Sequence, residues 1–151
     1  MRNTREAVAS ALLTLLQGVT FSQPVGGAVT WRSTSRKLKV FSEVPPVSRP
    51  ALFLTEHHED TSYQSENLPP KMSMSFNVFI YLNGKGAAVP AVDLNVILDA
   101  IDVALAPEMA TGRQTLGNLV SHCRIDGQTL KDPGDLDGDG LLWIPIRILG
   151  P

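Results

Sequence analysis

The segment 72–82 constrains the fold more than any other part of the chain. Every second position in it holds a large apolar side chain, and these are Met72, Met74, Phe76, Val78, Ile80 and Leu82. Successive side chains of a strand point to opposite faces, so this alternation predicts a strand with one continuous apolar face. Phe79 and Tyr81 add apolar groups to the other face. We therefore expect that end of the strand to be covered on both sides.

Two segments have the spacing of amphipathic helices. The first runs from about residue 4 to 17, with a capping-box pattern before it and Gly18 as a natural C-terminal stop. The second begins at Pro90 and ends before Pro107. Its acidic residues Asp93, Asp99 and Asp102 are expected to be exposed. The apolar stripes of the two helices are Val8, Leu12, Leu15 and Leu16, and Leu94, Ile97, Leu98, Ile101 and Leu105.

The other segments complete a prediction of strands and loops. Residues 59–71 are polar and contain Pro69-Pro70, which is typical of a mobile loop or an extended hairpin arm. We predict further strands at 28–41, 50–54, 119–130 and 141–149, and loops at 19–27 and 132–140. The resulting order predicts one α+β domain over residues 1–151. Its mixed or antiparallel sheet carries two amphipathic helices on one face and an extended loop or hairpin arm.

Composition narrows the class of protein. The chain has 151 residues, of which 43% are hydrophobic and 19% charged, as in ordinary globular domains. No apolar run approaches the roughly 20 residues of a spanning helix, so we expect no membrane association. Arg2, Arg5 and Ala7–Leu16 resemble a short signal peptide, but Glu6 and the lack of an Ala-x-Ala site oppose this. Synthesis in a cytoplasm is expected.

Charge is unevenly distributed along the sequence. The net charge of −2 argues against a protein whose function is to bind nucleic-acid phosphates. Residues 1–40 hold six basic groups and one acid, whereas residues 41–151 hold seven basic groups and fourteen acids. The two parts can attract each other within one chain or between subunits. The basic cluster Arg36, Lys37 and Lys39 is expected at a subunit contact that faces acids such as those of 132–139.

The acidic loop 135–140 matches half of a calcium-binding loop. Asp135, Asp137 and Asp139 occupy positions 1, 3 and 5, and Gly140 occupies position 6. Position 12 is Ile146 instead of glutamate, and strands are predicted on both sides. We therefore expect an acidic turn, with a calcium-dependent binding module as an alternative. As surface sites, Asp137→Ala and Asp139→Ala are each expected to change the free energy of unfolding by about 0.5 kcal/mol or less.

No motif supports an enzyme, a cofactor or a metal. Neighbouring strand residues point to opposite faces, so His57 and His58 are not expected to ligate one ion. The same argument separates His122 from Cys123, which is expected in the core as a small buried thiol. Trp31 is expected to pack in the core as well. A small enzyme of unrecognised type is a further alternative.

Several short motifs follow one another along the chain. They are Arg5-Glu6-Ala7-Val8, Ser35-Arg36-Lys37-Leu38-Lys39, Glu43-Val44-Pro45, Pro50-Ala51-Leu52-Phe53, Val78–Asn83, Leu98–Ile101, Ala104–Pro107, Gln114–Cys123 and Ile144–Leu149. In this order they resemble the small tail terminator proteins of long-tailed double-stranded DNA bacteriophages. These are also called tail completion or tail-to-head joining proteins, and the likeness is to the lambda-like type.

The resemblance implies a non-enzymatic virion protein, made in the host bacterial cytoplasm. Such proteins form a six-membered ring on the head-proximal end of the tail tube, where the ring ends tube polymerisation and joins the neck of the capsid. The implied partners are the chain itself, the tail tube protein and a neck or head-completion protein, and DNA passes through without sequence-specific binding. Another tube or neck connector protein is the closest alternative. Our interface candidates are Arg36, Lys37, Lys39, Asp60, Tyr63, Glu66 and Lys71.

Overall fold

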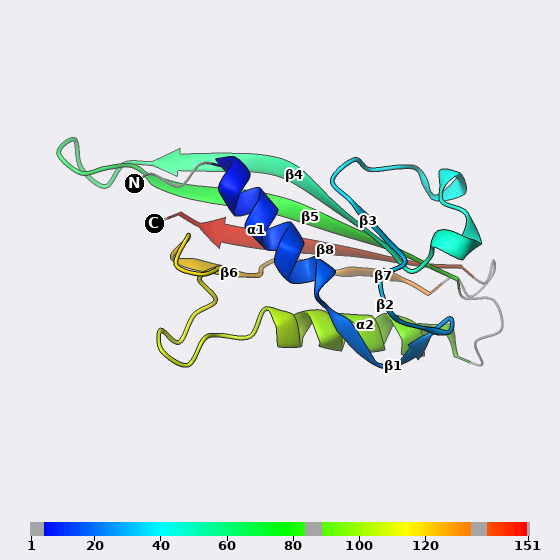
Figure 1. Ribbon diagram of the computed structural model, residues 1–151. Coiled ribbons are helices and arrows are strands. Elements are labelled where there is room, and N and C mark those ends of the chain that lie inside the picture. Colours follow the sequence, from blue (N-terminus) through cyan, green and yellow to red (C-terminus); the bar gives the residue numbers. More distant parts are fainter. Residues whose placement is uncertain (1–4, 84–88, 134–138, 151) are drawn as a thin grey trace.

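Two helices and a mixed sheet make up the α+β fold that the sequence predicted (Figure 1). The structure is a computed structural model that describes residues 5–83, 89–133 and 139–150. Its elements are α1 Arg5–Gln17, β1 Thr20–Val25, β2 Ala28–Thr30, β3 Ser33–Ser35, the 3-10 turns η1 Phe41–Glu43 and η2 Pro46–Ser48, β4 Ala51–Ser62, β5 Lys71–Asn83, α2 Pro90–Ala104, β6 His122–Ile125, β7 Leu130–Asp132 and β8 Asp139–Leu149.

The main sheet has the strand order β3-β4-β5-β8-β6, and β7 also pairs with β8. Only the β3–β4 pair is parallel, and the other pairs are antiparallel. Strands β5 and β8 form the centre, in register from Ser73 opposite Leu149 to Asn83 opposite Asp139. The segment 72–82 is therefore a strand, as its alternation predicted.

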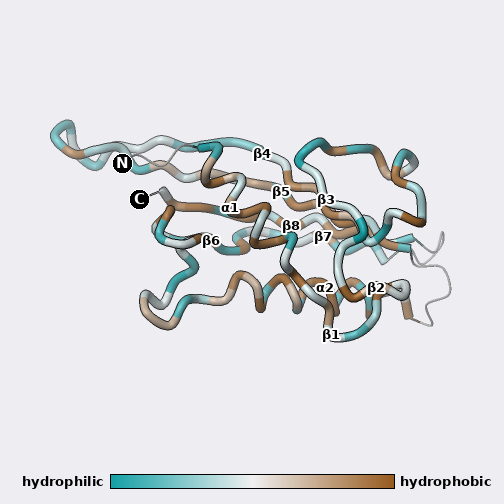
Figure 2. The backbone as a smooth tube through the Cα atoms, in the orientation of Figure 1, coloured by the Kyte–Doolittle hydropathy of each residue, from teal (hydrophilic) through white to brown (hydrophobic). Residues whose placement is uncertain are grey.

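The apolar face of β5 and β8 is covered by the two helices. Phe76, Val78 and Ile80 on β5 and their even-numbered neighbours on β8 are buried in one core with α1 and α2. The helices bury the predicted stripes, and Leu12, Leu16, Leu94, Ile97 and Ile101 have no exposed surface. Figure 2 shows the hydrophobic colour along the middle of β5 and β8.

A second, smaller core lies on the other face of the sheet. Phe53 and Tyr81 are buried there together with Val44, and Phe41 of η1 packs against them. The Tyr81 hydroxyl donates a hydrogen bond of 2.6 Å to the Lys39 carbonyl oxygen, and burial raises the pKa of Tyr81. This end of β5 is therefore covered on both sides, as predicted, by the segment that connects β3 to β4.

Three of the predicted segments are wrong. Residues 19–27 are not a loop, because β1 and β2 form a hairpin whose turn is Gly26-Gly27, with positive φ at both glycines. The strand predicted at 28–41 ends at Ser35, and residues 36–40 have no regular structure. Residues 119–130 form only the short strand β6 and the start of β7. Gly127 turns the chain between them with φ of 124°, and a Cβ there would lie 3.1 Å from Pro145.

The β1–β2 hairpin completes the core beside α2. Trp31, which follows β2, is 8% exposed, which confirms its predicted place in the core. Its Nε1 donates a hydrogen bond of 2.7 Å to the Leu16 carbonyl oxygen at the end of α1. Its ring meets Phe21 of β1 edge to face, at 5.0 Å between centroids. Neither helix in the described ranges is long and apolar enough to cross a membrane.

Cys123 provides a direct test of the core. The residue is 2% exposed, as predicted, and burial raises the pKa of its thiol to about 12. The thiolate is the reactive form of cysteine, so a thiol reagent at pH 8 should modify Cys123 only when the chain unfolds. We expect negligible reaction with a colorimetric disulfide reagent in buffer and stoichiometric reaction in concentrated urea. Equal rates in both solvents would contradict the buried position.

Candidate assembly surfaces

Strand β4 leaves a long open edge on the main sheet. Strand β3 pairs only with Ala51–Phe53, so the rest of β4, from Leu54 to Ser62, has β5 on one side and no described strand on the other. An open edge presents unpaired backbone N–H and C=O groups that can accept another strand. Strand β4 also carries three acids and no lysine or arginine. Because Leu54 is buried and Thr55 half-buried, the part of this edge that another strand could reach is Glu56–Ser62.

The far part of this edge is the predicted arm. Residues 59–71 form a hairpin in which β4 continues to Ser62 and β5 starts at Lys71, and Figure 1 shows it extending beyond the helices. Of the two forms predicted for this segment, the hairpin arm is the one that forms. The interface candidates Asp60, Tyr63, Glu66 and Lys71 are all exposed on it.

A β-bulge lies where the arm leaves the core. The register between β4 and β5 shifts between Glu56 and His58, which leaves His57 as the extra residue. The ring centroids of His57 and His58 lie 4.7 Å apart, so the strict alternation from which their separation was argued does not hold at the bulge. The expectation that they do not ligate one ion stays a prediction. His58 shares a hydrogen bond of 3.2 Å with Ser75. Within the residues that the structure describes, no three His, Cys, Asp or Glu side chains are grouped to hold a metal.

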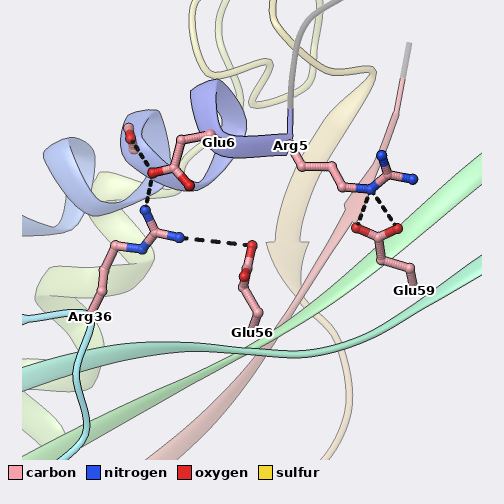
Figure 3. A network of polar contacts seen from close by, with 6 residues as sticks. Arg5, Glu6, Arg36, Glu56 and Glu59 are labelled. Carbon is pink, nitrogen blue, oxygen red and sulfur yellow. Dashed lines mark hydrogen bonds and ion pairs between the residues drawn. The ribbon is translucent and has the colours of Figure 1, made fainter.

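Ion pairs fix α1 to the β4 edge (Figure 3). Arg5 donates from Nε to both carboxylate oxygens of Glu59, at 2.8 Å each. Arg36 donates to Glu6 and also lies 3.9 Å from Glu56. The hydrogen bond from Arg36 lowers the pKa of Glu6, and the same bond raises the pKa of Arg36. Of the predicted basic cluster, Arg36 is thus engaged inside its own chain.

The other two members of that cluster are Lys37 and Lys39. They lie in an exposed stretch of four residues, which we call the Lys37–Val40 segment. Its lysines alternate with Leu38, which is 44% exposed, and Val40, which is 60% exposed. The backbone is held at Lys37, whose N–H donates to Ser35 Oγ, and at Lys39, whose carbonyl accepts from Tyr81. The side chains are therefore presented on a fixed backbone and not on a loose loop.

A groove lies between β1 and α2, at a place that the sequence did not indicate. Its volume is about 430 Å³, and its lining includes Phe21, Val96, Ala100 and Val103. Asp99 stands at the groove as well. Helix α2 carries three aspartates and no lysine or arginine, and burial raises the pKa of Asp93. The sequence did not predict the groove because one of its walls is β1, and residues 19–27 were expected to form a loop.

The opposite edge of the sheet is short and basic. Strand β6 contains Arg124 and no acid, and Arg147 lies opposite Arg124 on β8. Both arginines contact Asp126, at 3.3 and 3.9 Å. Burial lowers the pKa of His122, and the charges of Arg124 and Arg113 lower it further against the opposite effect of Asp126. The two edges of the sheet therefore differ in both length and charge.

The acidic loop is described only at its end. Asp135 and Asp137 lie outside the described residues. Asp139 opens β8, and its Oδ2 lies 3.5 Å from a guanidinium nitrogen of Arg49, which is 5% exposed. Arg49 also donates to Asn83 Oδ1 and to the Phe41 carbonyl, each at 3.1 Å. Asp139 thus balances a buried cation that the sequence did not single out, since an isolated arginine before Pro50 belongs to no periodic pattern.

Comparison of the sequence with protein-family models and with curated proteins gave no match. The candidate surfaces are therefore interpreted from their geometry and charge and from the motifs of the sequence.

The contact with Arg49 changes the expectation for Asp139. Removing the carboxylate takes the only described anionic partner from a buried guanidinium, so Asp139→Ala should lower the free energy of unfolding by about 1–2 kcal/mol. The exposed Asp102 makes no described ion pair, and Asp102→Ala should stay within about 0.5 kcal/mol. Urea denaturation of both variants measures the difference. Equal midpoints would show that Arg49 does not depend on Asp139.

The arm should be dispensable for folding. Residues 62–68 are exposed, and the core between β5 and the helices lies outside them. We expect the deletion of Ser62–Leu68 to leave a cooperative thermal transition and to weaken contact with another subunit or with the tube. Circular dichroism and a sedimentation assay measure the two properties separately. Loss of folding would make the arm part of the core and would contradict its role as a contact element.

Proposed function

We propose that this protein is a tail terminator of a long-tailed bacteriophage. In this role it forms a ring on the head-proximal end of the tail tube, ends polymerisation of the tube and offers the surface that joins the neck. The proposal rests first on the ordered motifs that resemble this family. The structural observation that carries it is the unpaired edge of β4, which is exposed from Glu56 to Ser62 and is continued by the arm.

The geometry of the chain suits assembly into a ring. A closed ring is built from head-to-tail contacts, which join two different surfaces of neighbouring copies. The two sheet edges are different in this way, because the unpaired part of β4 is long and β6 is short. Their charges differ as well, although Glu56 and Glu59 of β4 and Arg124 of β6 already have partners of opposite charge in the same chain. Opposite charges orient such contacts, and apolar contact supplies most of their stability. A ring in which each subunit has a projecting arm can also bind a tube of matching symmetry through these arms.

The proposed partners follow from this role. They are further copies of the chain, the tail tube protein and a neck or head-completion protein, and DNA passes through the ring without sequence-specific contacts. The site of action is the virion, after synthesis in the host cytoplasm. The chain has no enzymatic step to perform in this role and requires no cofactor.

The mass of the purified protein in solution tests the proposal. Size-exclusion chromatography with light scattering should show a particle of six 16.3 kDa chains, and electron microscopy of the same fraction should show rings. A titration with calcium in the calorimeter tests the alternative of a calcium-dependent module and should show no heat of binding. A stable monomer at high concentration, with tube ends present in the same sample, would overturn the proposal.

A further inference from the structure

We propose that in the ring the Lys37–Val40 segment of one copy seats in the groove between β1 and α2 of the next copy. This inference rests on the proposed function, since it names the contact that would close the ring. The occupant is a second copy of this chain.

The donor side has the chemistry of an inserted segment. Leu38 and Val40 are large apolar side chains exposed to solvent by 44% and 60%. Lys37 and Lys39 alternate with them and make no ion pair within the described ranges, whereas Arg36 is held by Glu6. Hydrogen bonds at Ser35 and Tyr81 fix the backbone, so docking would order little additional chain.

The receiving side has apolar room and a charge opposite to that of the lysines. The groove of about 430 Å³ is within the size range of ligand pockets, so it has room for two aliphatic side chains. Val96, Ala100 and Val103 provide an apolar lining, and Val103 is 76% exposed in the single chain. Asp99 at the groove and Asp102 on the same helix can face the two lysines. With no basic residue on α2, nothing on the helix repels them.

The two surfaces lie on opposite sides of the molecule. Figure 1 shows the segment that follows β3 beyond the β4 edge of the sheet, whereas α2 lies on the far side with β1 next to it. One copy therefore cannot fill its own groove with its own segment. A contact between unlike surfaces repeats from copy to copy and produces a ring where the rotation closes.

The groove is a better receiver than the acidic loop expected from the sequence. Residues 134–138 lie outside the described part of the chain, and the described Asp139 already faces Arg49. Asp99 of α2 lines the apolar groove.

A charge-reversal exchange tests the contact. Lys37→Glu with Lys39→Glu gives one chain, and Asp99→Lys with Asp102→Lys gives another. Each alone should assemble at least about tenfold more weakly than the parent at low salt. The loss should be smaller in 1 M salt, where the screening length falls to about 3 Å. Mixing the two chains should restore rings. At one contact a segment with lysines then meets a groove with aspartates, and at the next a segment with glutamates meets a groove with lysines.

The controls separate the possible outcomes. A chain that carries all four substitutions has the parental net charge and should form rings by itself. Leu38→Ser and Val103→Ser test the apolar part without charge and should each weaken assembly, with thermal melting unchanged. Parental rings that persist in all of these variants would overturn this contact and leave the proposed function intact. Failure of the parent chain to form rings would overturn both.

Discussion

The paired strands β5 and β8 carry one apolar face that has to be covered along their shared length. Helices α1 and α2 meet this requirement with stripes whose central residues are fully buried, and the β1–β2 hairpin fills the space beside α2. At one end the other face is apolar as well, and the connection from β3 to β4 folds back over it. Beyond the cover, the β4–β5 hairpin continues as a largely hydrophilic arm (Figure 2). The exposed surface of the arm thus begins where the apolar pattern of the strands stops.

Much of this architecture was predictable because it depends on side-chain periodicity. The alternation in β5 and the helical stripes of α1 and α2 are local patterns with a direct structural meaning. The prediction errors occurred where contacts between residues far apart in the sequence determine the local structure. The β1–β2 hairpin is stabilised by Trp31 against α1 and Phe21, and the strand expected at 28–41 ends early because residues 36–40 connect β3 to a second core. The bulge at His57 reverses a facing that simple alternation assigns.

The candidate surfaces were only partly accessible from sequence. The basic cluster was visible as a run of charge, but its division into an internally paired Arg36 and two exposed lysines required the position of Glu6. The groove beside α2 and the pair of the buried Arg49 with the half-buried Asp139 join residues far apart in the chain, and no spacing rule indicates them. The two edges of the sheet differ from each other, so the molecule has two unlike sides. Together these features favour a protein that binds copies of itself head to tail.

Imaging of tube ends tests the terminator role most directly. Purified protein is added to growing tail tubes assembled from the tube protein of the same virus, and the mixture is examined by electron microscopy. The account predicts a closed ring at one end of each tube, with growth stopped at that end. Binding along the tube wall, or continued growth through the added protein, would contradict it.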